Sequence, residues 1–161
     1  MEIDITEVGV EQTTECRYQI TVRKNDNLTA KYYLDFKKIT QEMRLWFVDV
    51  YTHPKILDHT YLIEFYDIKA LAACDMNKRS QFDTYSMMEY SLYERDYFFA
   101  SGIGEAIFRF KTQSQARVLL CVPLRPALAR IYDRLLKKHA HSVHCLYRAD
   151  LVEDGLYVIE T

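Results

Sequence analysis

The chain has 161 residues, of which 49% are apolar and 27% are charged, and its formal net charge is −2. This length and balance predict one packed globular domain over residues 1–161 and exclude a disordered or fibrous chain. Because the chain has no strong positive charge, no run of about 18 apolar residues and no secretory signal at its start, we expect it to bind neither nucleic acid nor a membrane and to stay in the cytoplasm.

Three strands are predicted in the first 40 residues from the alternation of apolar and polar side chains. The alternation is clearest over residues 16–23 and 28–37, which are separated by the turn-tolerant sequence Asn25-Asp26-Asn27. We therefore expect a β-hairpin here, preceded by a short strand at residues 3–8.

The middle of the chain carries weaker signals. Apolar residues at steps of three and four predict a helix from Thr40 to about Tyr51, which Pro54 would end. A strand is expected at residues 60–66 and one or two helical turns at residues 68–74, whereas residues 77–94 fit either a helix or a long loop.

Two further strands are predicted at residues 97–100 and 106–110, joined around Gly102 and Gly104. A Gly-x-Gly sequence can also bind phosphate, but that function needs a helix that opens directly behind the glycines. Because a strand is predicted there, we expect a hairpin connection instead of a phosphate loop.

The last third predicts a strand, a helix and two more strands. Residues 118–122 form a continuous apolar run typical of a central strand, and the apolar stripe that follows Pro126 predicts the clearest helix of the chain. Residues 143–152 and 156–160 would then close the chain as a second hairpin. The expected fold is α+β, with a mostly antiparallel sheet, two or more helices on one face, and a strand-helix-strand-strand ending.

The four cysteines are far apart in the sequence, and none has the close spacing of a metal or redox motif. Cys16, Cys74, Cys121 and Cys145 each have apolar or aromatic neighbours. We expect buried free thiols, as in a reducing compartment.

Asp58 and His59 are candidates for acid-base chemistry, because a carboxylate that orients an imidazole is the usual arrangement of a general base. Adjacent side chains on an extended segment point to opposite faces, so two surface loop residues are the simpler interpretation.

Short motifs of the chain resemble the 6-pyruvoyl-tetrahydropterin synthase family. They are Tyr18-x-Ile20-x-Val22, Leu34-Asp35-Phe36-x-x-Ile39, Leu57-Asp58-His59-x-x-Leu62, and Pro123 followed by Leu128-Ala129. The resemblance implies a tunnelling fold and a small metabolic enzyme in which Asp58 and His59 belong to the catalytic set. It does not extend to the family's zinc ligands, because no histidine precedes His53.

The order of the last four predicted elements resembles the topology of N-acetyltransferases. That resemblance implies a coenzyme whose pyrophosphate binds free amides at the start of a helix. Pro123 and Pro126 remove two such donors, so an acyltransferase is a secondary alternative.

His139, His141, His144 and Cys145 bring four potential ligands for zinc or copper into seven residues. Their spacing does not place them on one face of a strand or helix. The alternative is a frayed helix end with histidines near the negative end of the helix dipole. We expect no bound metal or other cofactor.

A stretch rich in tyrosine, methionine and acidic residues runs from Phe82 to Phe99. Such side chains form adaptable surfaces that bind proteins, basic partners in particular, although packing in the core is an equal alternative. The residues expected to bind a partner are Tyr85, Met88, Tyr90, Tyr93, Glu94 and Tyr97.

The predicted function is a non-catalytic interaction protein, such as an inhibitor, an immunity protein or a regulatory subunit. One alternative is a small metabolic enzyme of the tunnelling-fold or acyltransferase type, with Asp58 and His59 at its site. The other is a structural protein that forms a homodimer through the same aromatic surface.

Overall fold

The computed structural model describes residues 1–10, 14–24, 28–77, 82 and 87–161, apart from the side chains of residues 74–77. Within these ranges seven strands form one sheet in the order β1-β2-β3-β4-β5-β7-β6. The strands are β1 (Glu2–Val8), β2 (Cys16–Arg23), β3 (Thr29–Lys38), β4 (Thr60–Asp67), β5 (Val118–Cys121), β6 (Leu146–Tyr147) and β7 (Tyr157–Glu160). Neighbouring strands are antiparallel except β4 and β5, which are parallel. The predicted α+β fold with a mostly antiparallel sheet is confirmed.

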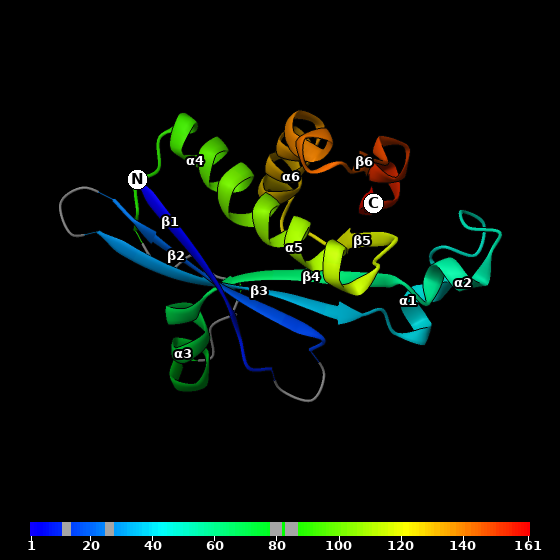
Figure 1. The fold of residues 1–161 in the computed structure, drawn as a ribbon, viewed down its shortest axis with the longest axis horizontal. Coiled ribbons are helices and arrows are strands. Elements are labelled where there is room, and N and C mark those ends of the chain that lie inside the picture. Colours follow the sequence, from blue (N-terminus) through cyan, green and yellow to red (C-terminus); the bar gives the residue numbers. More distant parts are fainter. Residues whose placement is uncertain (11–13, 25–27, 78–81, 83–86) are drawn as a thin grey trace.

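Helices lie on both faces of this sheet. The α-helices are α1 (Gln41–Leu45), α2 (Pro54–Leu57), α3 (Ile68–Asn77), α4 (Leu92–Phe98), α5 (Glu105–Ser114) and α6 (Pro126–His139). A π-helical segment, Phe99–Gly104, joins α4 to α5, and the 3-10 helices Ala140–Val143 and Ala149–Asp154 flank β6. Figure 1 shows α4, α5 and α6 together on one face and α3 on the other. Among the described residues, no helix has the length and apolar content needed to cross a membrane.

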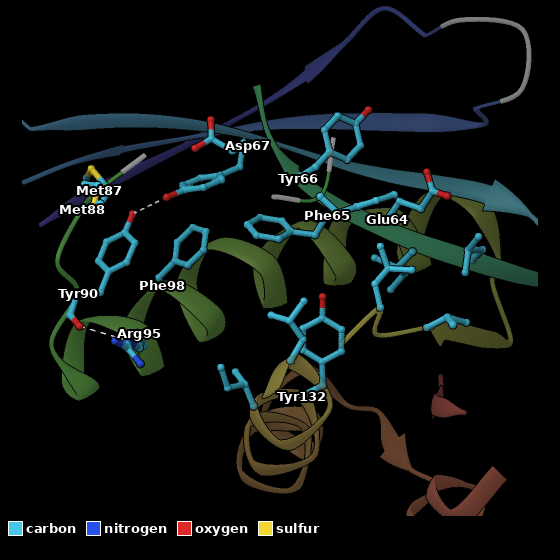
Figure 2. Close-up of a pocket in the computed structure, with 18 of the residues that line it drawn as sticks. Glu64, Phe65, Tyr66, Asp67, Met87, Met88, Tyr90, Arg95, Phe98 and Tyr132 are labelled. Carbon is cyan, nitrogen blue, oxygen red and sulfur yellow. Dashed lines mark hydrogen bonds between the residues drawn. The ribbon is translucent and has the colours of Figure 1, made fainter. Parts of the chain in front are cut away.

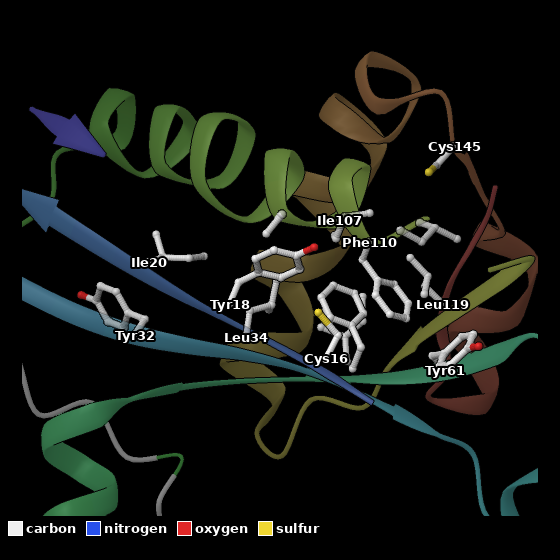
Figure 3. Packing of buried hydrophobic residues seen from close by; sticks show 14 of the residues in the cluster. Cys16, Tyr18, Ile20, Tyr32, Leu34, Tyr61, Ile107, Phe110, Leu119 and Cys145 are labelled. Atoms are coloured by element: carbon white, nitrogen blue, oxygen red, sulfur yellow. The ribbon is translucent and has the colours of Figure 1, made fainter. Parts of the chain in front are cut away.

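The main core lies between the sheet and the layer of α4, α5 and α6 (Figure 3). Alternate residues of β2 and β3, such as Ile20, Leu34 and Phe36, have no exposed surface. The ring of Phe110 from α5 stacks on that of Phe36, with ring centroids 3.9 Å apart. The period-two pattern that predicted these strands therefore also identifies the face that packs against the helices.

The hairpin predicted over residues 97–110 is wrong, because this segment belongs to a continuous helix from Leu92 to Ser114. The helix starts at a capping box, in which the Ser91 hydroxyl accepts from the Glu94 amide at 3.2 Å and the Glu94 carboxylate accepts from the Ser91 amide at 2.8 Å. Its buried side chains Phe98, Ala106 and Phe110 then recur at helical steps. The aromatic residues that suggested strands serve here as the apolar face of a helix.

Other predicted boundaries also differ. The first helix ends at Leu45 instead of Tyr51, and Pro54 begins α2 instead of ending a helix, a position that its missing amide hydrogen allows. The strand predicted over residues 143–152 is only two residues long. His144 adopts left-handed backbone angles, with a φ of 56°, and residues 149–154 form a 3-10 helix, and an extended strand permits neither.

The described cysteines are free thiols. Cys16 and Cys145 are buried and Cys121 is partly buried. Burial raises the pKa of Cys16 to about 11 and that of Cys121 to about 12, so both thiols stay protonated at neutral pH. The side chain of Cys74 lies outside the described residues.

Candidate functional site

The strands β4 and β5 run side by side over only four residues and then separate. Residues 60–63 of β4 pair with residues 118–121 of β5, whereas β4 continues to Asp67 beside β3. Beyond Cys121 the chain leaves the sheet and enters α6. In the part of the chain that the structure describes, residues 64–67 of β4 therefore have a paired strand on the β3 side only.

A cavity of about 650 Å³ opens where the two strands separate (Figure 2). We call it the β4 groove. Strand β4 contributes residues 62–67 to its lining, helix α4 contributes Arg95 and Phe98, and helix α6 contributes Leu128, Ile131 and Tyr132. The other lining residues are Tyr32, Met43, Trp46, Phe82, residues 87–90, Val122 and Leu124. Its volume lies within the range of small-molecule and cofactor sites, roughly 300–1,000 Å³.

A smaller chamber of about 190 Å³ adjoins the β4 groove on the core side. Phe98 and Tyr132 line both spaces, and the chamber extends to the core residues Leu34, Leu135 and Ile159. A cavity of about 150 Å³ lined by apolar side chains can bind benzene. This inner chamber is therefore large enough to accept one aromatic ring.

Tyrosines provide neutral polar groups within this apolar lining. The hydroxyls of Tyr32 and Tyr90 share a hydrogen bond of 3.2 Å, and the ring of Tyr90 stacks on Phe98 at 5.8 Å between centroids. Burial raises the pKa of Tyr32, Tyr90 and Tyr132 above the ordinary value, so all three hydroxyls are neutral at pH 7.

Four charged side chains also line the β4 groove: Glu64, Asp67, Glu89 and Arg95. Glu64 forms an ion pair with Lys37 at 2.7 Å, and the Arg95 Nε donates to the carbonyl of Tyr90 at 3.1 Å. The Asp67 carboxylate accepts from the amide of Lys69 at 2.8 Å, whereas Glu89 is exposed. The groove therefore suits a mainly apolar ligand, with the carboxylate of Glu89 available to a positive charge.

Large apolar side chains around the mouth of the β4 groove remain exposed to solvent. The exposed fractions are 85% for Met87, 60% for Leu124, 46% for Trp46 and 39% for Val122. Exposed apolar groups that adjoin a cavity mark a binding surface more strongly than isolated ones do. We call these four residues the apolar rim.

The residues predicted to bind a partner divide into three groups. Met88 and Tyr90 line the β4 groove, although Met88 is only 3% exposed. Tyr93 and Tyr97 are exposed on α4 and do not line it, and Glu94 is engaged in the capping box and in an ion pair with Lys24 at 3.0 Å. Tyr85 lies outside the described residues.

The sequence did not indicate the part that other elements play in this site. Phe65 comes from the buried strand β4, Leu124 from the turn after β5, and Tyr132 from the apolar stripe of α6. In the sequence, each of these residues fits the pattern of a core or turn position, which does not indicate a binding site. The one usable signal was Pro123 directly after the apolar run of β5, which indicates that the strand ends there.

The structure does not bring the histidine tract together. His139 lies at the end of α6 with its ring 6.0 Å from that of Phe99, whereas His141 and His144 are exposed. Cys145 is buried. In the part of the chain that the structure describes, no group of three or more His, Cys, Asp or Glu side chains is placed to hold a metal ion.

Asp58 and His59 have different surroundings. Asp58 is exposed and forms an ion pair with Arg44. His59 is partly buried, and its Nδ1 has no hydrogen-bond partner among the described residues. Neither residue lines the β4 groove. The candidate acid-base pair is therefore separate from the cavity.

Gly102 and Gly104 allow close packing inside a helix. A Cβ at Gly104 would lie 3.3 Å from both the Phe99 carbonyl oxygen and Val143, and one at Gly102 would lie 3.1 Å from the Phe98 ring. A helix does follow these glycines, contrary to the predicted strand. Because the same helix begins ten residues earlier, at Leu92, the glycine amides are not the free amides of a helix start that bind phosphate.

Replacing Gly104 with alanine is expected to lower the free energy of unfolding by about 1 kcal/mol. Overpacking against a backbone oxygen costs about 1–3 kcal/mol, which exceeds the roughly 1 kcal/mol gained in helix propensity. Gly9→Ala is the control, because an added Cβ there meets nothing within 4 Å. Urea denaturation of both variants measures the difference, and equal effects would contradict the packing role.

The β4 groove with its apolar rim is the site defined by the geometry of the described residues. Comparison of this chain with protein families, with curated proteins and with solved structures finds no match.

Proposed function

We propose that this protein is a non-catalytic interaction module, of the inhibitor, immunity-protein or regulatory-subunit type, and that it binds a partner protein in the β4 groove. One observation carries the proposal: an apolar cavity is continuous with exposed apolar side chains around its mouth. Apolar cavities are the usual sites of ligands, and exposed apolar patches that adjoin them are the usual sites of protein partners.

The apolar rim favours a protein over a small molecule as the ligand. A small molecule is mostly enclosed by its pocket, so it would leave Met87 and Leu124 in contact with water. A partner protein covers the rim while one apolar side chain fills the inner chamber, which is how anchor residues at protein interfaces act. Tryptophan, tyrosine, methionine and arginine, the residues enriched at interfaces, all line this groove.

The polar groups of the groove support binding rather than catalysis. The Glu64 carboxylate is held by Lys37, and the hydroxyls of Tyr32 and Tyr90 bond to each other. Burial moves the pKa of both hydroxyls further from neutrality, whereas a general acid or base works best with a pKa near the operating pH. These groups are suited to orient a ligand.

Replacing Leu124 with lysine is expected to weaken partner binding about 10-fold or more, because it puts a charge into the apolar rim. Leu146→Lys is the matched control: Leu146 is exposed to 61%, against 60% for Leu124, and it lies on β6 outside the groove. The immobilised wild-type chain and both variants are used to capture proteins from the native host, followed by quantitative mass spectrometry.

The expected result is a stoichiometric protein that the wild type and Leu146→Lys retain and Leu124→Lys loses. Light scattering of the same three chains tests whether the partner is a second copy, since the wild type would then be a dimer and Leu124→Lys a monomer. Equal capture by all three chains, or no stoichiometric capture by the wild type together with a monomeric state, would contradict the proposal.

An acyltransferase is the second candidate, and the position of the groove favours it. In open α/β sheets, ligands bind at the carboxyl ends of parallel strands where the topology switches. The β4 groove lies at the carboxyl ends of β4 and β5, the parallel pair of the described sheet. Calorimetric titration with acetyl-coenzyme A tests this candidate. Saturable binding that Leu124→Lys abolishes would support it, and absence of binding would exclude it.

A further inference from the structure

The β4 groove runs along the edge of a strand instead of over one face of the sheet. Residues 62–67 all line it, although consecutive side chains of a strand point to opposite faces. Phe65 pairs with the buried Leu34 on the core side, whereas Tyr66 donates a hydrogen bond to Asp35 on the other side at 2.8 Å (Figure 2). Both sets of side chains can line one cavity only if the cavity wraps around the edge of β4.

The backbone of β4 shows which groups face this edge. The carbonyl of His59 accepts from the amide of Arg117 at 2.8 Å, on the β5 side, and the carbonyl of Thr60 accepts from the amide of Ile39 at 3.4 Å, on the β3 side. Backbone groups of a strand alternate between its two edges, so odd-numbered residues point their amide and carbonyl toward β5. At Phe65, beyond the end of the β5 pairing, these groups point into the groove.

Phe65 has no hydrogen-bond partner on this side among the described residues, since the pairing with β5 ends at Ile63 and no other backbone or side-chain group bonds to it. An amide and a carbonyl beside apolar walls are costly to leave unpaired. An open strand edge is also a ready template for pairing with another chain. The groove thus combines backbone donors and acceptors with apolar pockets on both sides of one strand.

We propose that the partner binds as an extended segment that adds a strand beside residues 64–67 of β4, in the place that β5 leaves. This inference rests on the proposed function and specifies its mode of binding. In this mode, main-chain hydrogen bonds give affinity and pockets for alternate side chains give specificity.

The two-sided lining favours a strand over a helix as the occupant. Side chains of an added strand alternate between the faces of the sheet. One set would enter the inner chamber between Phe98 and Tyr132, and the other would contact Leu62 and Trp46 on the far side of β4. A helix presents one apolar stripe and would use only one of these surfaces.

The charges of the groove define the partner further. Among the acidic residues that line the groove, Glu64 is paired with Lys37 and Asp67 accepts from the amide of Lys69, whereas Glu89 is exposed and lies where the carboxylate can meet a partner's positive charge. Opposite charges across an interface fix its register and exclude other partners. The segment that fits is therefore extended, apolar at alternate positions and lysine- or arginine-bearing.

The test uses the full chain and a library of random dodecapeptides displayed on phage. Enriched peptides are synthesised with and without a methyl group on each backbone nitrogen in turn, and their affinities are measured by fluorescence anisotropy. We expect alternating apolar residues with at least one lysine or arginine. Methylation is expected to weaken binding about 10-fold at alternate positions only, because every second amide of a strand faces β4.

Variants of β4 provide a second, independent measurement. Phe65→Pro removes the amide that faces the groove, and Phe65→Ala is the matched control, because it also loses the ring but keeps that amide. Phe65→Pro is expected to bind the peptides about 10-fold more weakly than Phe65→Ala. The methylated peptides test strand addition on the wild-type chain. Strand addition therefore remains testable even if one of the Phe65 variants does not fold.

Three other outcomes would overturn the inference in different ways. Peptides with apolar residues at steps of three and four, insensitive to the pattern of methylation, would show that the groove binds a helix, and the proposed function would stand. Methylation effects at every position or at none would also exclude strand addition. Peptides that bind Leu124→Lys as well as the wild type would place the binding surface elsewhere, and the proposed function would fail too.

Discussion

Replacing Asp35 with alanine is expected to lower the free energy of unfolding by about 3–5 kcal/mol, the usual effect of removing one partner of a buried ion pair. The Asp35 side chain has no exposed surface and that of Arg17 is 14% exposed. The guanidinium contacts both carboxylate oxygens, at 2.7 Å from Nε and 2.8 Å from Nη2. The hydroxyl of Tyr66 donates to the same carboxylate at 2.8 Å.

The loss is large because the guanidinium of Arg17 would lose both bonds to the carboxylate and keep its bond to the neutral hydroxyl of Tyr66, at 2.8 Å from Nη2. Hydrogen bonding to Asp35 raises the pKa of Arg17 in the wild type. Arginine remains protonated at neutral pH even without that bond, so the guanidinium stays charged when the carboxylate is removed. Its stacking over the ring of Tyr33, 4.6 Å from the centroid, continues to hold it in place. An unpaired charge would then lie against the sheet.

Urea denaturation monitored by tyrosine and tryptophan fluorescence measures this effect. Glu105→Ala is the control, because the ion pair of Glu105 with Arg109 is 43% and 44% exposed at its two side chains and contributes less than about 1 kcal/mol. Similar losses in the two variants would mean that Asp35 is not the centre of a buried network.

Replacing Phe36 with alanine is expected to cost about 3–5 kcal/mol, as for other buried phenylalanines. The ring has no exposed surface, stacks on Phe110 and meets the edge of Tyr18 at 6.1 Å between centroids. The variant would leave a cavity between the sheet and α5. The control is Phe108→Ala, which removes a phenylalanine of α5 that is 40% exposed, and for which a loss below about 1 kcal/mol is expected. A thermal or urea transition of Phe36→Ala close to that of the wild type would contradict the assigned core.

The strands β2 and β3 and the helix α6 could be predicted from the sequence because each repeats one simple pattern. In β2, the buried residues Tyr18, Ile20 and Val22 alternate with more polar neighbours, and the structure buries that face. In α6, Leu135 and Leu136 lie on the predicted apolar stripe and are buried. Such patterns are local, so they can be recognised without knowledge of the rest of the chain.

The sequence contains a signal for the start of the helix over residues 92–114, but the aromatic residues of this segment favoured strands. Ser91 and Glu94 have the spacing of a capping box, which is a sequence signal in its own right. The aromatic residues Tyr97, Phe98 and Phe99 favour strands in isolation. Burial of Phe98 against the sheet, a tertiary effect, outweighs that preference.

The β4 groove could be predicted only in part. Met88 and Tyr90 belong to the stretch that the sequence singled out, whereas Phe65 and Tyr132 come from elements more than 20 residues away on either side. These residues lie together because β5 stops pairing with β4 at Ile63. The point at which two distant strands stop pairing cannot be predicted from the local sequence pattern of either strand.

Amide hydrogen exchange of the chain, free and bound to the captured partner or to a selected peptide, tests the central claim most directly. We predict that binding slows exchange at residues 64–67 and 87–90 and at Val122 and Leu124, with the amide of Phe65 among the most protected. Protection confined to the outer surface of α4 around Tyr93 and Tyr97, with β4 unchanged, would contradict the assignment of the β4 groove as the binding surface.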